Sequence, residues 1–149
     1  MHIVFDMDNT LTDEFGQKIR PCIMELLKRL IKEGHKLSVW TSSSRDRAHL
    51  ILDTLKIRTY FKEVICREDY DPNNKDIGKD IRKISGDILV DDDPKQIRYV
   101  KSINRKGYLI KPFRVGRSVD NEELVSLIKQ IKKENGFFKK VFGSLYGSI

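Results

Sequence analysis

The chain has 149 residues, 39% of them hydrophobic, and a formal net charge of +7. This length predicts one domain that can bury a core without disulfides or structural metal. No run approaches the roughly 18 apolar residues of a membrane span, and the N-terminus shows no basic leader before an apolar segment, so we expect a cytoplasmic protein. Cys22 and Cys66 stand far from any His or Cys at ligand spacing, which favours core-facing roles in a helix and a strand over a disulfide or a metal site.

The positive charge is concentrated toward the C-terminus. Residues 1–100 hold 18 Lys and Arg against 18 Asp and Glu, whereas residues 101–149 hold 11 against 4. This basic third is either a surface that faces an anion or the solvated face of a Lys-rich helix, and both interpretations stay open.

Short apolar runs alternate with helical patterns along the chain. Strands are expected at His2–Phe5, Lys36–Thr41, Glu63–Cys66, Asp87–Val90 and Gly107–Ile110. Helices are expected at Pro21–Glu33, Arg45–Leu55, Asp76–Lys83, Pro94–Asn104 and Glu122–Glu134. This alternation predicts an α/β fold: a single Rossmann-like, three-layer α/β/α domain over residues 1–135 with a mostly parallel, five-stranded sheet.

The final segment, residues 136–149, is aromatic and basic and follows the last expected helix. It either packs back on the core or contacts a second copy of the chain, a partner or a membrane surface. A homo-oligomer formed through this tail is therefore one expectation.

The first expected strand ends abruptly in two carboxylates, Asp6 and Asp8, followed by Thr10. Two adjacent carboxylates repel each other by up to about 4 kcal/mol at an effective dielectric of about 20, so they need a cation, a shared proton or a solvated turn. The fourth expected strand repeats the pattern with Asp91 and Asp92. Two such strand ends side by side would hold a hard dication with oxygen ligands.

Polar residues at the carboxyl ends of parallel strands face one crevice and are best interpreted together. Besides the carboxylates, the second strand ends in Thr41 and Ser42, and the loop before the fourth strand contains Lys75. Hydroxyls, a fixed cation and metal-binding carboxylates are the parts that phosphoryl transfer requires. Asp6 could attack a dianionic phosphate only if Mg²⁺ and Lys75 cancel the negative charge on the phosphate oxygens. Asp8 could serve as the general acid and base.

In this order, Asp6-x-Asp8-x-Thr10, Thr41, Lys75 and Asp91-Asp92 resemble the four motifs of the haloacid dehalogenase (HAD) superfamily. The resemblance implies a phosphoaspartate at Asp6, acid/base chemistry at Asp8 and phosphate binding by Thr41 and Lys75. It further implies Mg²⁺ bound by Asp6, the Asp8 backbone carbonyl and Asp91. Thr10 would stabilise the loop after the first strand, and Asp92 would stabilise the metal ligands without binding the metal itself.

Within that superfamily the likeness is greatest to the phosphatases of the RNA polymerase II C-terminal domain and their NLI-interacting-factor-like relatives. It spans residues 3–94 and includes Val39–Ser44, Lys75–Ile81 and Leu89–Pro94. It favours Lys75 over Lys79 as the phosphate-binding lysine. The family usually has Asp-Leu-Asp-Glu-Thr-Leu where this chain has Asp-Met-Asp-Asn-Thr-Leu.

Neither interval that could hold a cap domain is long enough for one, so we expect an open, uncapped site. Such a site accepts a bulky substrate such as a phosphoprotein or a nucleic-acid end, or needs a partner subunit to exclude water. The phosphorylated substrate could be a protein, a nucleic-acid end or a small molecule. The leading hypothesis is a Mg²⁺-dependent phosphomonoester phosphatase. The alternatives are a polynucleotide 3′-phosphatase that uses the basic third and a non-catalytic phosphate-binding or scaffold module.

Helix caps and surface charges explain the remaining polar residues near these motifs. Ser44 is expected to cap the helix that begins at Arg45, and Asp93 the helix that begins at Pro94. Arg45 and Arg47 could reach an anionic substrate, but exposed helix charges are the more common case.

Overall fold

The computed structural model describes the backbone of residues 1–118 and 122–146, and the side chains within these ranges up to Gly136. Its centre is a five-stranded parallel sheet with the strand order β3-β2-β1-β4-β5. The strands are β1 (His2–Phe5), β2 (Lys36–Trp40), β3 (Val64–Ile65), β4 (Ile88–Asp91) and β5 (Lys106–Leu109). The predicted α/β fold with a parallel five-stranded sheet is confirmed.

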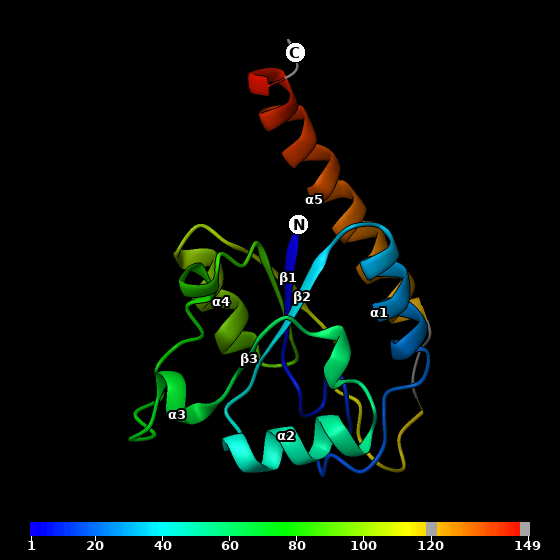
Figure 1. Cartoon of the computed structure of the whole chain (residues 1–149), viewed down its shortest axis with the longest axis vertical. Helices are drawn as coiled ribbons and strands as arrows, with labels where there is room; N and C mark the ends of the chain where they lie inside the picture. Colours follow the sequence, from blue (N-terminus) through cyan, green and yellow to red (C-terminus); the bar gives the residue numbers. More distant parts are fainter. Residues whose placement is uncertain (119–121, 147–149) are drawn as a thin grey trace.

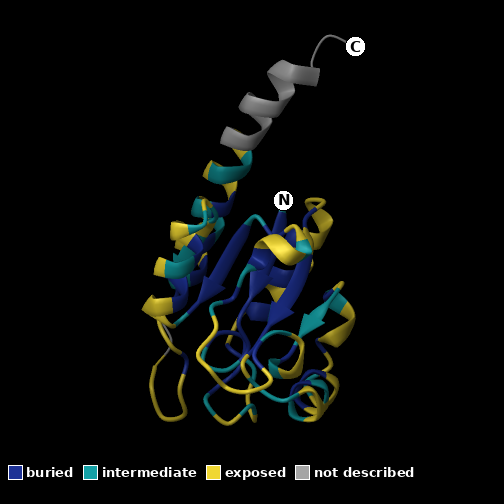
Figure 2. Ribbon diagram, turned by 90° about the vertical axis from the view of Figure 1, so that its left-hand side faces the viewer, coloured by how far each residue is buried: buried dark blue, intermediate teal, exposed yellow. Residues whose placement is uncertain are grey.

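Most side chains of the central strands are apolar and buried, because both faces of the sheet are covered, as is usual for parallel sheets. Along β1, Ile3 and Phe5 face one core cluster, while Val4 between them faces the other. All three side chains are fully buried. Figure 2 shows the central strands as a buried layer, with exposed residues on the outer sides of the helices.

Helices cover the two faces of the sheet, so the domain has three layers. Helices α1 (Ile23–Lys32) and α5 (Glu122–Tyr146) lie on one side of the sheet, and α4 (Pro94–Ser102) lies on the other (Figure 1). The buried positions of α1 and α5 recur every three or four residues, which gives each helix one apolar face; they are Ile23, Leu26, Leu27, Leu30, Leu124, Leu127 and Ile131. On the other side, Val100 of α4 packs with Val4 and Leu89.

The remaining helices follow the carboxyl ends of β2 and β3. Helix α2 (Arg45–Thr54) starts after Ser44, whose side chain accepts a hydrogen bond from the Arg47 N–H, so the predicted cap is confirmed. The other short elements are η1 (Arg58–Tyr60), α3 (Arg67–Tyr70) and η2 (Ile81–Ile84). Asp93 caps α4 through the Lys95 N–H, also as predicted.

The predicted helix Asp76–Lys83 is wrong. Only the short η2 forms there, and residues 75–80 have no regular structure. Side chains outside this segment replace helical carbonyls as hydrogen-bond acceptors: Asp71 accepts from the N–H groups of Lys75 and Ile77, and Gln96 accepts from that of Lys79. This irregular path determines which lysine reaches the sheet.

The core-facing position predicted for Cys22 and the predicted end of the last helix are wrong. Cys66 is fully buried, as expected. Cys22 is exposed, because α1 begins only at Ile23 and Cys22 precedes it in a left-handed conformation with φ 65°. Helix α5 does not end at Glu134 but continues to Tyr146. The proposed packing or oligomer contacts of the aromatic tail fall on side chains outside the described residues.

Over residues 1–118 and 122–146, the structure contains no separate cap domain. Within the same ranges, no helix combines the length and the apolar character that crossing a membrane requires.

Candidate active site

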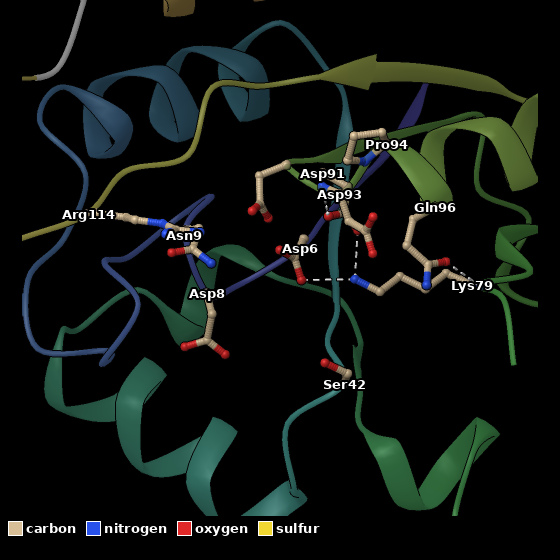
Figure 3. Close-up of a pocket in the computed structure, with 11 residues that line it drawn as sticks. Asp6, Asp8, Asn9, Ser42, Lys79, Asp91, Asp93, Pro94, Gln96 and Arg114 are labelled. Atoms are coloured by element: carbon tan, nitrogen blue, oxygen red, sulfur yellow. Dashed lines mark hydrogen bonds and ion pairs between the residues drawn. The ribbon is translucent and has the colours of Figure 1, made fainter. Parts of the chain in front are cut away.

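A cavity of about 430 Å³ opens at the carboxyl ends of β1 and β4, where a parallel sheet places its ligands. Figure 3 shows the side chains that line it. They are Asp6, Asp8, Asn9, Ser42, Lys79, Asp91, Asp92, Asp93, Pro94, Gln96 and Arg114.

Three carboxylates form a cluster in this cavity. Asp6, Asp91 and Asp92 each offer an oxygen that lies within 4.8 Å of the other two. β1 and β4 are adjacent in the sheet, and the Asp6 N–H donates to the Val90 carbonyl at 2.9 Å, so the two strands end together. The Thr10 hydroxyl lies 3.2 Å from Asp6 Oδ2 and 3.5 Å from Asp92 Oδ1, which ties the first loop to both acids. A donor set made of carboxylate oxygens fits a hard divalent cation.

Lys79, and not Lys75, is the lysine of this site. Its Nζ lies 2.9 Å from Asp6 Oδ1 and 2.7 Å from Asp91 Oδ2, and the residue is only 3% exposed (Figure 3). Lys75 is exposed and does not line the cavity. The preference for Lys75 is therefore wrong, because the irregular path of residues 75–80 directs Lys79 inward.

Burial and mutual repulsion control the ionisation of these groups. Burial raises the pKa of Asp6 to about 6, although Lys79 opposes the shift. Burial and the nearby Asp6 raise the pKa of Asp91 to about 6 as well. Burial alone would lower the pKa of Lys79, but the Asp6 and Asp91 carboxylates outweigh it and raise that pKa. Lys79 thus keeps its charge at neutral pH, and a divalent cation would further favour the ionised acids.

Asp8 lines the same cavity but stands apart from the acid cluster. Its carboxylate points away from Asp6 (Figure 3) and accepts two hydrogen bonds from Arg47 of α2, at 2.8 and 2.9 Å. Arg47 also donates to the Ser43 hydroxyl at 2.9 Å. Arg47 was expected to be either an exposed helix charge or a contact for an anionic substrate, and no local pattern predicts its pairing with a carboxylate 39 residues away.

The two predicted hydroxyl residues take different positions. Ser42 is exposed and lines the cavity. Thr41 is buried, and its hydroxyl accepts a hydrogen bond from the Ser43 N–H at 3.0 Å, so it shapes the turn after β2. Ser42 is therefore the more accessible hydroxyl of the pair.

Arg20 is a buried residue that sequence reasoning missed. Its guanidinium donates to the carbonyls of Thr10 and Asn9, at 2.6 and 2.9 Å, and to the carbonyl of Lys111. It also lies 5.9 Å from the centre of the Phe113 ring. Arg20 thereby joins the loop after β1 to the segment after β5. Asn9, Gln96 and Arg114 are further lining residues that the sequence analysis did not select.

Solved structures share this fold at low sequence identity. A candidate β-phosphoglucomutase from Thermotoga maritima matches with a TM-score of 0.61 and 14% identity, covering 84% of this chain and 90% of that one. A hydrolase from Streptococcus pneumoniae TIGR4 has the same TM-score and identity, covering 75% of this chain and 93% of its own. The core domain of a candidate phosphoglycolate phosphatase from the same organism has a TM-score of 0.56 and 12% identity, covering 86% and 94%.

This parallel sheet, with an acid cluster at the ends of its first and fourth strands, has the fold of these solved structures. The chain belongs to the family of NLI interacting factor-like phosphatases, whose model matches residues 1–141. It is accordingly a phosphoric monoester hydrolase. A comparison with curated proteins finds no significant match.

Proposed function

We propose that the protein is a Mg²⁺-dependent phosphomonoesterase that works through an aspartyl-phosphate on Asp6. The observation that carries this proposal is the position of Asp6, which lies between the Lys79 ammonium group and two further carboxylates at the end of β1. A binding module would not require a carboxylate nucleophile and a separate acid in one cavity.

In the first step, a carboxylate oxygen of Asp6 attacks phosphorus as the bond to the leaving oxygen breaks, and Asp8 gives that oxygen a proton. In the second step, water attacks the same phosphorus, the bond to Asp6 breaks, and Asp8 takes the proton from the water. Bound Mg²⁺, held by Asp6, Asp91 and the Asp8 carbonyl with Asp92 beside them, would neutralise charge on the phosphate oxygens.

Lys79 and the Ser42 hydroxyl would hold the phosphate. Lys79 keeps its charge because two carboxylates face it, so it can attract a phosphate dianion to Asp6. Ser42 lines the cavity and can donate a hydrogen bond to the phosphate, while Thr41 supports the turn that presents Ser42.

Arg47 would restrain the acid/base function of Asp8, because its two hydrogen bonds hold the Asp8 carboxylate ionised and turned away from Asp6. We expect Arg47→Met to speed hydrolysis of alkyl phosphates by roughly two- to tenfold, because Asp8 no longer has to leave this ion pair before it protonates the leaving oxygen. The release of p-nitrophenolate, a leaving group that departs without a proton, should change less. Single-turnover rates with both substrates measure the difference.

Arg45→Met is the matched control for this variant. Arg45 lies in the same helix but pairs with Asp69 at 2.6 Å and does not line the cavity. Equal rates for the two variants on both substrates would contradict the restraint of Asp8 by Arg47.

The proposed function is tested by hydrolysis of p-nitrophenyl phosphate with Mg²⁺ and after its removal by a chelator. We expect turnover only with the metal, and a hydroxylamine-sensitive phosphoenzyme after acid quenching. Turnover that is unaffected by the chelator, or that never passes through a phosphoenzyme, would refute the proposal.

A further inference from the structure

Arg114 lines the active-site cavity on the side opposite Lys79. Figure 3 shows Arg114 and Asn9 on one side of Asp6, with Lys79 and Gln96 on the other. Arg114 comes from the segment that follows β5, far in sequence from the phosphatase motifs. The cavity thus has a cation on each side of the proposed nucleophile.

The two cations differ in what they contact. Lys79 is buried and already paired with Asp6 and Asp91. Arg114 is exposed, and its guanidinium forms no ion pair with any residue in 1–118 or 122–136, although five carboxylates line the same cavity. An arginine that remains unpaired beside so many acids is available to an anion from solution.

The backbone of Arg114 is held in place from both sides. The Phe113 N–H donates to the Asn9 carbonyl at 2.8 Å, and the Val115 N–H donates to Glu14 Oε2 at 3.0 Å. The Phe113 side chain is 8% exposed and lies beside Arg20. Because both neighbours are bonded to the loop after β1, binding a ligand through Arg114 requires little ordering of the backbone.

Asn9 adds an uncharged amide next to Arg114. Its Oδ1 is buried and has no hydrogen-bond partner among the described residues. The Asn9 carbonyl is already used by Arg20 and Phe113, so its backbone is fixed as well. Only the NH₂ group of the Asn9 amide could donate to an anion, so the unpaired Oδ1 does not itself contribute to anion binding, and Arg114 is the residue that carries the inference.

We propose that Arg114 determines substrate specificity by binding a second anionic group, a carboxylate or a phosphate, on the leaving group of the phosphomonoester. This inference rests on the proposed function, which puts the reacting phosphate at Asp6 and Lys79. A cavity of about 430 Å³ lies within the range of small-ligand sites and can hold the reacting phosphate together with a small leaving group.

The test compares substrates that differ only in the second anion. Propyl phosphate and 3-phosphooxypropanoate differ by a carboxylate in place of a methyl group, and thymidine 3′-phosphate and thymidine 3′,5′-bisphosphate differ by a phosphate. We expect the protein to prefer the second member of at least one pair by roughly 10- to 100-fold in kcat/KM, the usual range for a charged hydrogen bond. The pair that shows the preference identifies the anion.

Arg114→Met should reduce this preference to near unity, mainly through KM. Arg117→Met is the matched control, since Arg117 is exposed in the same segment but does not line the cavity. Equal kcat/KM within both pairs, or a preference that survives in Arg114→Met, would overturn the inference.

Binding measurements separate this inference from the proposed function. Calorimetry with Asp6→Asn and Mg²⁺ compares the same ligand pairs without turnover. If the wild-type protein does not hydrolyse p-nitrophenyl phosphate, the proposed function fails, but tighter binding of the doubly anionic ligands that disappears in Asp6→Asn/Arg114→Met still supports Arg114. Equal binding of both members of each pair would overturn it.

Discussion

Asp6→Asn is expected to lower kcat for p-nitrophenyl phosphate by at least about 10⁴-fold, as is typical when a nucleophile is removed. Asparagine preserves the shape of the side chain, but a neutral amide cannot form the acyl phosphate. The measurement is steady-state hydrolysis with saturating Mg²⁺, together with trapping of phosphoenzyme, which should be absent in the variant.

Asp53→Asn is the control for this substitution. Asp53 is exposed on α2 and pairs with Arg58, outside the cavity. We expect this variant to keep wild-type activity, and a circular dichroism spectrum of each variant verifies folding. Full activity in a folded Asp6→Asn protein would refute the role of Asp6 as nucleophile.

Lys79→Met and Lys75→Met are expected to differ sharply. Removing Lys79 takes away the cation 2.9 Å from Asp6, so kcat/KM should fall by roughly 10²- to 10³-fold, as for the loss of one preorganised charge donor. Lys75 is exposed and lies outside the cavity, so its replacement should change kcat/KM by no more than about twofold. Parallel assays with p-nitrophenyl phosphate measure both; equal losses would contradict the assignment of Lys79.

Lys79→Met should also make stability fall more steeply as pH rises than it does in the wild-type protein. Asp6 and Asp91 already have a pKa of about 6, above the usual value, because they are buried, and Lys79 opposes this shift. With Lys79 gone, both pKa values rise further, so the folded state binds still more protons than the unfolded state, and stability falls more strongly from about pH 5 to 8 than in the wild-type protein. Thermal unfolding of both proteins without metal measures this slope, which should be smaller with Mg²⁺; a slope no steeper than that of the wild-type protein would contradict it.

Much of the candidate site could be predicted from local patterns. Asp6 and Asp91 follow short apolar runs, and such runs in an α/β protein are buried parallel strands that end at the ligand edge. The caps at Ser44 and Asp93 were predictable for the same reason, since a cap bonds to N–H groups two or three residues away. In each case, the interaction or burial that decides the structure lies within a few residues.

The choice of lysine, the partner of Asp8 and the position of Arg114 were decided only by the tertiary structure. The Lys79 side chain reaches the site because the Lys79 backbone N–H donates a hydrogen bond to the side chain of Gln96, which lies in helix α4. Arg47 reaches Asp8 across 39 residues, and Arg114 reaches the cavity because its neighbours bond to the loop after β1. The physical reason is the range of the interaction: apolar periodicity and caps act between chain neighbours, whereas these side-chain contacts depend on the path of the whole folded chain.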